Sequence, residues 1–481
     1  MVKRILDMFK IFSVSVIVFF LFFSCKKDNT PSGAIENLTF SEDTIFFDTL
    51  FAELPNVTKV FKVYNSSNDD ILIDKIFLKN NSNYYSFTVN GTQLNTQINN
   101  VKINAKDSIW CFAKVNISGN SETNPFILED EFVLQSGSKQ NKIKVLAWGQ
   151  NAHFHKATSG NEFYEINENT VWSSDLPHIV LGICKVQNQA ELKIEKNSKV
   201  YFYNNSALLI DSGSTLKILG ELDNIVHFKS TRLESYMQDI AGQWRGIILN
   251  PKSVNNEINF LNLQNAQTGI KLDSSENYTD NQLILKNTII NNCSQYGIWS
   301  NNSNFTAYNS LISNCLINAL RISQGGKFNL YHCTLASYKN SIGLNSSSLS
   351  ISGIGFKNDI EVFNDVINSG LYNCIVAGNV SPQISILNNS NINYQINFSH
   401  VLTPNTITVF SNITIENLVV NNNPMFEDNI NFNLKLNSPA IQQGKLSILT
   451  DNFVILQKDL IGNKRLNNIQ PDLGCLQYVE K

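Results

Sequence analysis

Apolar and polar residues alternate in the N-terminal part of the chain, in short segments separated by polar turns. Clear cases span residues 60–64, 71–77 and 109–115. A period of two places successive side chains on opposite faces of a β-strand, so that one face can be buried. About seven such strands, the number typical of a two-sheet sandwich, fit between residues 35 and 150. The pattern predicts an antiparallel β-sandwich there.

The pattern changes beyond residue 172. Apolar triplets such as 192–194, 200–202 and 216–218 alternate with turns rich in Asn, Ser and Gly. Strands this short, at this spacing, are typical of one coil of a solenoid rather than of a sandwich. The polar stretch 151–171 between the two patterns is predicted to be a linker.

A sequence repeat sets the period of the second region. Asn-Thr-Ile-Ile-Asn-Asn-Cys at 287–293 recurs as Asn-Ser-Leu-Ile-Ser-Asn-Cys at 309–315, 22 residues later. Coils stack about 4.8 Å apart, so equal positions form columns. Three pairs are expected to stack: Asn287 with Asn309, Asn292 with Asn314, and Cys293 with Cys315. The cysteines are expected as free thiols, because parallel side chains rarely present a disulfide dihedral angle.

Residues 172–481 resemble the right-handed parallel β-helix family, the pectate-lyase-like superfold. The stretch 242–249, Gly-Gln-Trp-Arg-Gly-Ile-Ile-Leu, is similar to a coil that recurs in its bacterial lipoprotein members. Segments 434–441, 459–465 and 471–478 resemble their closing segment, which implies a C-terminal cap over the last coil's open edge. The fold expected is all-β, with an N-terminal immunoglobulin-like β-sandwich followed by a right-handed parallel β-helix.

The first residues predict an exported, lipid-anchored protein. A basic start and an apolar run in residues 1–24 are typical of a signal peptide. Leu-Phe-Phe-Ser-Cys at 21–25 resembles the lipobox of bacterial lipoproteins of the Bacteroidota type, which implies lipidation of Cys25. Residues 25–34 then form a tether. The resemblance implies an outer-membrane location, with the cell surface favoured over the periplasmic face.

Composition and charge limit the classes of partner. The 481 residues carry 37 Lys and Arg against 40 Asp and Glu, a formal net charge of −3. Such a balance gives no basic footprint for nucleic acid. No nucleotide-binding fingerprint is present in the sequence. We expect no cofactor, no nucleic-acid partner and a monomer, with the membrane and a polysaccharide as the partners.

Candidate chemistry is sparse. Lyases on this scaffold need a basic proton acceptor, and hydrolases need paired carboxylates. Arg321, Lys327 and His332, on consecutive coils, are the basic candidates for a lyase base or substrate clamp. Two acidic loops, one with Asp273, Glu276 and Asp280 and the other with Asp359, Glu361 and Asp365, are interpreted as solvated turns rather than calcium sites. The two imidazoles of His153 and His155 lack a third ligand, so they do not predict a metal site either.

A column of tyrosines is the strongest binding candidate. Tyr308, Tyr331 and Tyr372 each follow an apolar residue and precede the Asn or His of their repeat. Alternation turns the apolar residues inward and the tyrosines outward. Outward rings on successive coils would form a stacking strip for sugars, although tyrosine is also common on exposed sheet faces for its β-propensity alone.

The function expected is therefore non-catalytic: a lipid-anchored envelope protein whose β-helix presents an elongated face for glycan or protein binding. The alternative is a polysaccharide lyase or glycoside hydrolase with an unrecognised site. A third possibility is a structural spacer that binds no ligand. No catalytic residue is assigned, because fold alone does not imply an activity.

Overall fold

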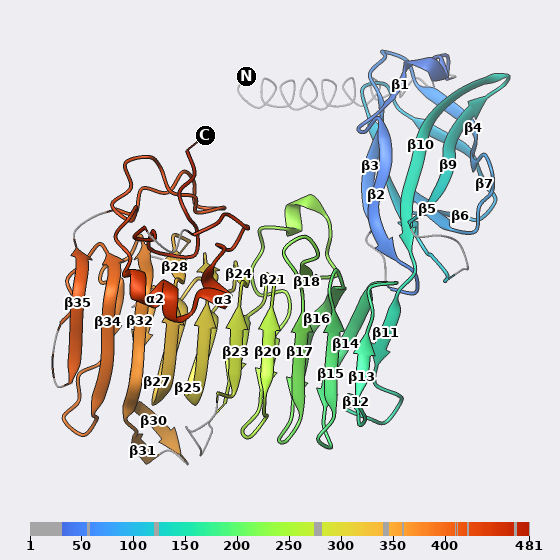
Figure 1. Ribbon diagram of the computed structural model, residues 1–481. Helices are drawn as coiled ribbons and strands as arrows, with labels where there is room; N and C mark the ends of the chain where they lie inside the picture. The colour runs from blue at the N-terminus through green and yellow to red at the C-terminus, as the bar shows by residue number, and fades with distance from the viewer. Residues whose placement is uncertain are drawn as a thin grey trace, which may run out of the picture. The chain divides into compact units, whose positions relative to one another are not determined.

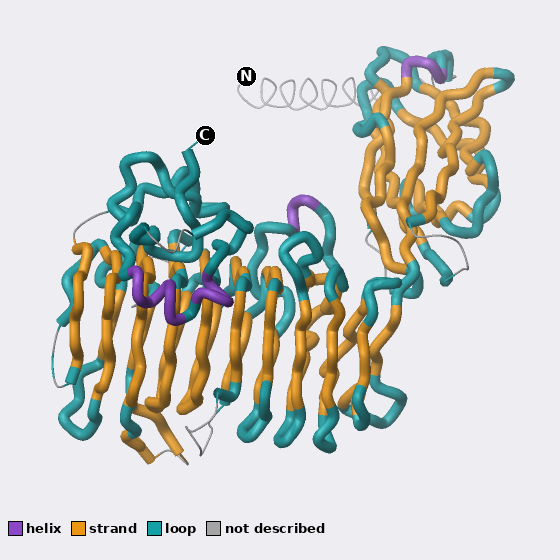
Figure 2. Tube along the Cα trace, in the orientation of Figure 1, coloured by secondary structure: helices purple, strands orange, loops and turns teal. Residues whose placement is uncertain are grey.

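The computed structural model describes residues 31–54, 58–119, 125–273, 281–339, 346–357, 360–408, 410, 412–420, 423–465 and 469–480. The chain divides into two compact units, Met1–Gln150 and Asn151–Lys481. Nearly all regular structure in both is β-strand (Figure 2). Among these residues no helix has the length and apolar character needed to span a membrane. The predicted signal peptide and Cys25 lie outside the described residues.

The first unit consists of two five-stranded sheets around one hydrophobic core, with strand orders β1-β3-β8-β5-β6 and β2-β10-β9-β4-β7. Alternation causes this layering: in β8 (Ser108–Val115) every second residue, including Cys111 and Ala113, is buried. One pair, β10 with β2, is parallel, whereas the sequence pattern predicted an antiparallel unit. These strands come from opposite ends of the unit, so no hairpin forces them to be antiparallel.

The elements of the first unit are η1 (Ile35–Asn37), β1 (Leu38–Phe40), β2 (Thr44–Phe51), β3 (Lys59–Asn65), β4 (Ile71–Leu78), β5 (Tyr85–Val89), β6 (Thr92–Leu94), β7 (Gln97–Ile103), β8, β9 (Phe126–Ser136) and β10 (Lys139–Gln150).

The second unit is a solenoid of parallel strands, which confirms the predicted coil architecture. Its large sheet has 23 strands, and each pairs in parallel with the equivalent strand of the next coil (Figure 1). Every coil passes through three faces, numbered here in chain order, and the inward side chains share one core. A two-stranded antiparallel hairpin, β30 (Ile354–Lys357) with β31 (Ile360–Phe363), projects from one coil.

Face 1 contains β11 (His153–Lys156), β18 (Val226–Ser230), β21 (Leu261–Gln264), β24 (Ile289–Asn291), β26 (Leu311–Ser313) and β28 (Thr334–Ser337). Face 2 contains β12 (Phe163–Ile166), β19 (Gly246–Leu249), β22 (Thr268–Leu272), β29 (Leu349–Ile351) and β33 (Ile384–Ile386). Face 3 contains β13 (Thr170–Trp172), β15 (Glu191–Glu195), β17 (Thr215–Leu219), β20 (Asn256–Asn259) and β23 (Leu283–Lys286).

Longer strands turn a corner and belong to two faces. Faces 1 and 2 share β14 (His178–Val186) and β16 (Lys199–Ile210); faces 2 and 3 share β25 (Tyr296–Tyr308) and β27 (Asn318–Tyr331); faces 3 and 1 share β32 (Val366–Gly378), β34 (Tyr394–Thr403) and β35 (Ile413–Val420). The helical elements are η2 (Ser235–Met237), α2 (Leu446–Asp451) and α3 (Phe453–Leu456).

The 22-residue register is confirmed at the corner between faces 3 and 1. Asn309 donates from Nδ2 to Oδ1 of Asn287 at 2.8 Å, and both have a positive φ, 52° and 48°. Asn tolerates this left-handed conformation better than most residues, which explains its repetition at the corner. At the next corner the register also makes Asn292 and Asn314 neighbours, as predicted. Their amides bond elsewhere: Asn314 donates to Oδ1 of Asn291 at 3.3 Å, and Asn292 donates to Oδ1 of Asn265 at 2.8 Å. Cys293 is a free, buried thiol, as predicted.

The stretch 151–171 is not a linker, contrary to the prediction. Its strands β11 and β12 pair with β14, and β13 pairs with β15, so it forms the first coil. His155 is buried there, and so is Trp172 directly after this stretch. The many polar residues of this coil concealed its strand pattern.

The C-terminal segment, residues 423–480, does not close the last coil's edge as predicted. It packs on the outward side of face 1, where Phe432 and Leu434 join Leu311 and Ile375 in one apolar cluster. Figure 1 shows the segment running back along the solenoid, with α2 and α3 near the ends of β32, β27 and β25. Leu311, Ala336, Ile375 and Leu402 face outward from face 1 in these coils, so covering them removes apolar surface from water.

Candidate functional site: a tyrosine ladder and an adjoining pocket

The three predicted tyrosines form a ladder on face 3. Register pairs Lys286 with Tyr308, Tyr308 with Tyr331, and Tyr331 with Tyr372. The residues that precede the tyrosines, Ala307, Leu330 and Leu371, are fully buried in the core. The alternation therefore turns the tyrosines outward, as predicted.

The tyrosine rings stack on one another, which limits the ring surface that a ligand can contact. The centroids of Tyr308 and Tyr331 lie 5.1 Å apart, and those of Tyr331 and Tyr372 lie 4.8 Å apart, with planes within 12° of parallel. Both faces of Tyr331 are thus covered. A sugar cannot stack on it as predicted, and the ladder presents ring edges and hydroxyl groups instead.

Local packing holds the ladder in place. A Cβ on Gly370 would lie 2.6 Å from Cζ of Tyr372, so glycine is required to make room for that ring. Burial raises the pKa of Tyr331 to about 12, helped by Tyr372 and Tyr308. The hydroxyls therefore stay protonated near neutral pH and can both donate and accept hydrogen bonds.

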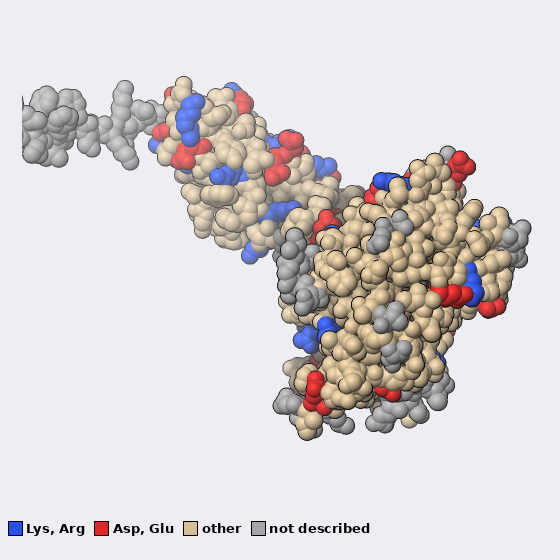
Figure 3. All heavy atoms as spheres, turned by 90° about the vertical axis from the view of Figure 1, so that its left-hand side faces the viewer, with Lys and Arg blue, Asp and Glu red and all other residues tan. Residues whose placement is uncertain are grey.

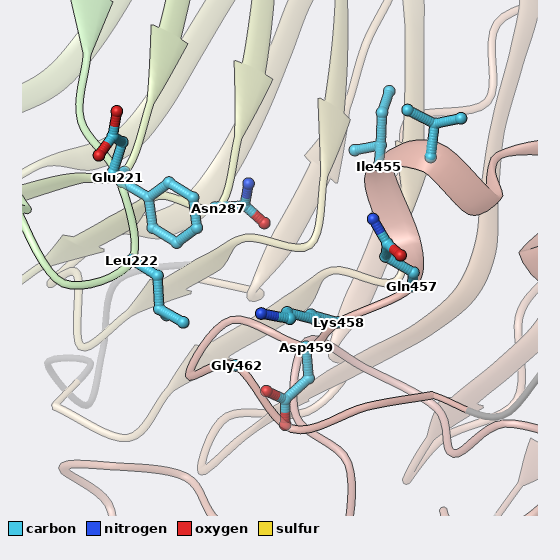
Figure 4. Close-up of a pocket in the computed structure, with 10 residues that line it drawn as sticks. Glu221, Leu222, Asn287, Ile455, Gln457, Lys458, Asp459 and Gly462 are labelled. Carbon is cyan, nitrogen blue, oxygen red and sulfur yellow. The ribbon is translucent and has the colours of Figure 1, made fainter.

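A pocket of about 300 Å³ lies beside the column of the ladder, at Asn287, the residue directly after Lys286 (Figure 4). It lies between the turns that follow the face 3 strands and the C-terminal segment. Leu222, Phe260, Val454 and Ile455 supply an apolar wall. The polar groups are Glu221, Asn287, Gln457, Lys458 and Asp459, and Gly462 completes the lining.

Gly462 and Asp459 shape this pocket. Gly462 has φ +95°, and a Cβ there would lie 2.6 Å from Cδ2 of Leu222, so the two sides can approach only with glycine. Asp459 accepts four hydrogen bonds, from Ile461, Asn463 (twice) and Gln477. The carboxylate of Asp459 therefore holds the C-terminal segment together. The side chain of Lys458 is the cation in the lining, and it extends across the pocket in Figure 4.

A second pocket, of about 480 Å³, contains the carboxylates of Glu191 and Glu257. The pKa of Glu257 is lowered, first by the hydrogen bond from Lys286 at 2.7 Å and also by Lys217. A hydrolase needs one carboxyl with a raised pKa as its acid. Glu257 is held ionised, so it does not provide that acid.

The predicted basic group does not assemble. Arg321 lies on face 2 with its guanidinium 5.3 Å from the ring centroid of Tyr296. Lys327 lies on face 3, opposite Asn304. His332 is fully buried at the corner beneath the C-terminal segment, and burial holds its pKa well below the usual value. The three residues therefore lie apart, and the prediction of a shared base or clamp is wrong. The sequence did not reveal that the C-terminal segment covers His332.

The remaining candidates are structural. His155 stacks on Trp172 at 4.3 Å, and its Nε2 lies 2.9 Å from Nδ1 of His178. Asp273 pairs with Lys271, and Asp365 accepts from the backbone of Asn393. No cluster of metal-ligating side chains occurs within the described ranges. Glu276, Asp280 and Asp359 lie outside them, and Glu361 is in β31.

The sequence analysis missed the pocket, because its two sides are far apart in the chain. The available signal was local: Phe260 follows directly after Asn259, at the corner position where later coils carry Asn287 and Asn309. Later coils carry the polar residues Asn or His at this corner, so the apolar ring of Phe260 stands out there, and it lines the pocket.

Charges are few on the side of the protein drawn in Figure 3, where acidic and basic side chains lie singly or as opposite pairs. Known proteins resemble this chain in structure rather than in sequence. No protein-family model matches the chain, and no curated protein matches it. A solved structure described as the catalytic domain of a GH87 alpha-1,3-glucanase in complex with nigerose is 11% identical, with a TM-score of 0.17. The match covers 76% of this chain and 89% of that one. At these values the likeness says nothing about activity.

Proposed function

We propose that the solenoid is a non-catalytic glycan-binding module that holds an extended, uncharged polysaccharide along face 3. The observation that carries the proposal is the unbroken column of Lys286, Tyr308, Tyr331 and Tyr372. The pocket lies beside this column and begins at Asn287, the residue directly after Lys286. The three tyrosines repeat a hydroxyl group on successive coils, and sugars offer hydroxyl partners along a chain. The pocket adds an apolar wall with a few polar groups, the composition typical of ligand sites.

We also propose that a lipid on Cys25 anchors this module at the outer membrane, on the cell surface. The support is the lipobox-like sequence at residues 21–25. Cys25→Ala is expected to move the protein from the membrane fraction to the soluble fraction and to abolish labelling by a fatty-acid analogue. Continued labelling of the variant would contradict the proposal.

Native electrophoresis in gels that contain single neutral polysaccharides tests the binding face. The wild-type protein is expected to be retarded by at least one glycan, and the triple variant Tyr308→Ala, Tyr331→Ala, Tyr372→Ala to migrate as if none were present. The triple Phe variant keeps the stacked rings and removes only the hydroxyls, so it is expected to lose most of the retardation while folding normally. Tyr236→Ala is the matched control, since Tyr236 is 58% exposed on η2.

Three outcomes decide the proposal. Retardation that both triple variants retain would reject the tyrosine ladder. Loss in Lys458→Met alone would restrict the site to the pocket. Release of reducing ends or unsaturated uronides from the same panel would replace binding by the alternative, a polysaccharide lyase or glycoside hydrolase.

A further inference from the structure

The sandwich of the first unit exposes apolar side chains on the outward face of one sheet, β1-β3-β8-β5-β6. On β3, Val60 and Tyr64 are 46% and 38% exposed, and on β8, Trp110 and Phe112 are 50% and 38% exposed. Register places Val60 opposite Phe112, and Lys62 opposite Trp110. Opposite side chains on neighbouring strands are within contact range, so these five residues form one patch, here called the aromatic face.

The aromatic face carries positive charge and lies on a sheet without acids. None of the five strands of this sheet contains Asp or Glu, and the acids of this unit that the structure describes lie on the other sheet or outside the strands. Lys62 and Lys114 alternate with buried residues along β3 and β8, so they point outward. Within the described residues no ion pair involves either lysine.

One of these lysines is held against the rings. Nζ of Lys62 lies 3.9 Å from the ring centroid of Trp110 and 5.9 Å from that of Tyr64. A cation over an aromatic ring is attracted by the electrons of the ring. The contact covers part of the ring face of Trp110, which disfavours stacking by a sugar, and it places an ammonium group beside exposed apolar surface.

The other sheet, β2-β10-β9-β4-β7, also exposes apolar residues but differs in charge. Phe46, Ile127 and Trp148 are exposed there. Glu129 lies on the same side of that sheet, paired with Lys144 at 2.9 Å. A carboxylate is repelled by an anionic surface, so of the two sheets only the one with the aromatic face fits such a surface.

The chain enters the sandwich beside the aromatic face. Cys25 and the first described residue, Pro31, are six residues apart, and an extended chain spans at most about 3.6 Å per residue. A lipid on Cys25 would therefore hold the start of the sandwich within about 20 Å of the membrane. The first strand after the tether, β1, pairs with β3 and places Thr39 opposite Tyr64 of the aromatic face.

We propose that the aromatic face docks on the lipid layer that holds the anchor, with its rings at the level of the headgroups and with Lys62 and Lys114 bound to headgroup phosphates. Aromatic rings favour the membrane interface, and lysines are attracted to anionic lipids. The choice of a lipid surface as the partner rests on the proposed lipid at Cys25. The contact is weak by itself, so a chain without this lipid still fractionates as soluble and binds vesicles only at high lipid concentration.

Sedimentation with lipid vesicles tests the docking on the full mature chain that carries Cys25→Ala. Vesicles of equal parts phosphatidylcholine and phosphatidylglycerol are expected to bind this chain, and vesicles of pure phosphatidylcholine to bind it about tenfold more weakly. The double variant Trp110→Ala, Phe112→Ala should weaken binding to the mixed vesicles about tenfold, and so should Lys62→Gln, Lys114→Gln.

Tryptophan fluorescence adds a readout that reports the face itself. Its emission should shift to shorter wavelength when the mixed vesicles are added, both in the parent chain and in Trp148→Phe, but not in Trp110→Phe. Trp148→Ala is the matched control for sedimentation, since Trp148 is 41% exposed on the other sheet. This control should bind the mixed vesicles as the parent chain does.

The other outcomes contradict the proposal. Absence of binding to both kinds of vesicle, equal binding by the parent chain and the Trp110 double variant, or a shift that depends on Trp148 would overturn the docking. Equal binding to neutral vesicles would overturn the role of the lysines. A dimer in sedimentation velocity that the double variant dissociates would assign the face to a second copy. Failure of the anchor is distinct, because a wild-type protein that takes up no fatty-acid analogue leaves vesicle binding by the Cys25→Ala chain unchanged.

Discussion

Faces 1 and 3 of the solenoid follow the same register but have opposite relations to solvent. On face 1 the outward residues Leu311, Ile375 and Leu402 are apolar and buried beneath the C-terminal segment. On face 3 the outward positions of the same coils carry Tyr308 and Tyr331, which remain half-exposed. The strand backbones are alike, so the outward side chains alone decide which face the chain returns to cover.

The comparison also explains the division within face 1. Its early coils carry lysine, histidine and Asn262 outward, and its later coils carry leucine and isoleucine. The C-terminal segment covers only the later coils. An outward column that changes from charged to apolar thus marks where a covering segment begins, and an outward column of polar and aromatic residues marks a face left for ligands.

Removing the central cation of the covered face should have the largest effect. Buried Arg465 donates to Oδ1 of Asn309 at 2.8 Å and to the carbonyl of Gly474 at 3.1 Å. Arg465→Met leaves these acceptors unpaired, so we expect a loss of about 3–5 kcal/mol in the free energy of unfolding. Urea denaturation and limited proteolysis of the C-terminal segment measure the effect.

Arg245→Met is the control for that variant. Arg245 is exposed, and substitutions at exposed positions usually change stability by no more than about 0.5 kcal/mol. Equal losses in the two variants would show that the segment is not held through Arg465, and the contrast between the faces would lose its structural basis.

The corner between the two faces should be the next most sensitive point. Asn309 donates to Asn287, accepts from Arg465 and has φ 52°. Asn309→Ala removes the amide and places a Cβ in a left-handed conformation, so a loss of about 2–3 kcal/mol is expected. Asn309→Gly is expected to recover about 1 kcal/mol of it, because glycine adopts this conformation freely. Equal unfolding midpoints for the two variants would mean that the backbone contributes nothing.

The periodic part of the structure could be predicted from the sequence. A repeat offset of 22 placed Asn309 beside Asn287, because parallel coils convert a period into a column. Tyr308 and Tyr331 are 23 residues apart, and their shared position before the Asn or His of each repeat placed them in one column. Each of these contacts joins neighbouring coils. Spacing along the chain therefore carries all of the information needed.

The aperiodic part could not be predicted. Arg465 lies 156 residues beyond the Asn309 that it contacts, and no repeat relates them. The burial of His332 and the position of the pocket both follow from that docking. The ring faces of the ladder were assigned to sugars because the sequence places residues on a face without fixing their side-chain angles.

Smaller effects are expected on the open face. Tyr331 stacks on two rings and Tyr308 on one, and a stacked aromatic pair contributes about 0.5–1.5 kcal/mol. Tyr331→Ala should therefore lose about 1–3 kcal/mol and Tyr308→Ala about half of that. Equilibrium unfolding of both variants, with Tyr331→Phe as the control that keeps the stack, measures the ratio. Equal losses would show that the rings do not act as a ladder.

The smallest expected effect is a pH dependence of stability, which is absent at neutral pH and differs between the two faces. Burial and Arg465 keep the pKa of His332 well below the usual value, so below about pH 6.5 only the unfolded chain takes up this proton and stability falls. Burial raises the pKa of Tyr331 to about 12, so stability also falls as the pH rises above about 10.

His332→Asn keeps the residue type found at this corner in other coils. It should flatten only the acid limb of a plot of unfolding temperature against pH, and Tyr331→Phe only the alkaline limb. His155 and His178, with pKa values lowered to about 3 and about 4, titrate in both variants and leave a residual acid slope. An acid limb that is unchanged in His332→Asn would show that the covered face does not sense acid, since the corner histidine is the buried imidazole beneath the segment.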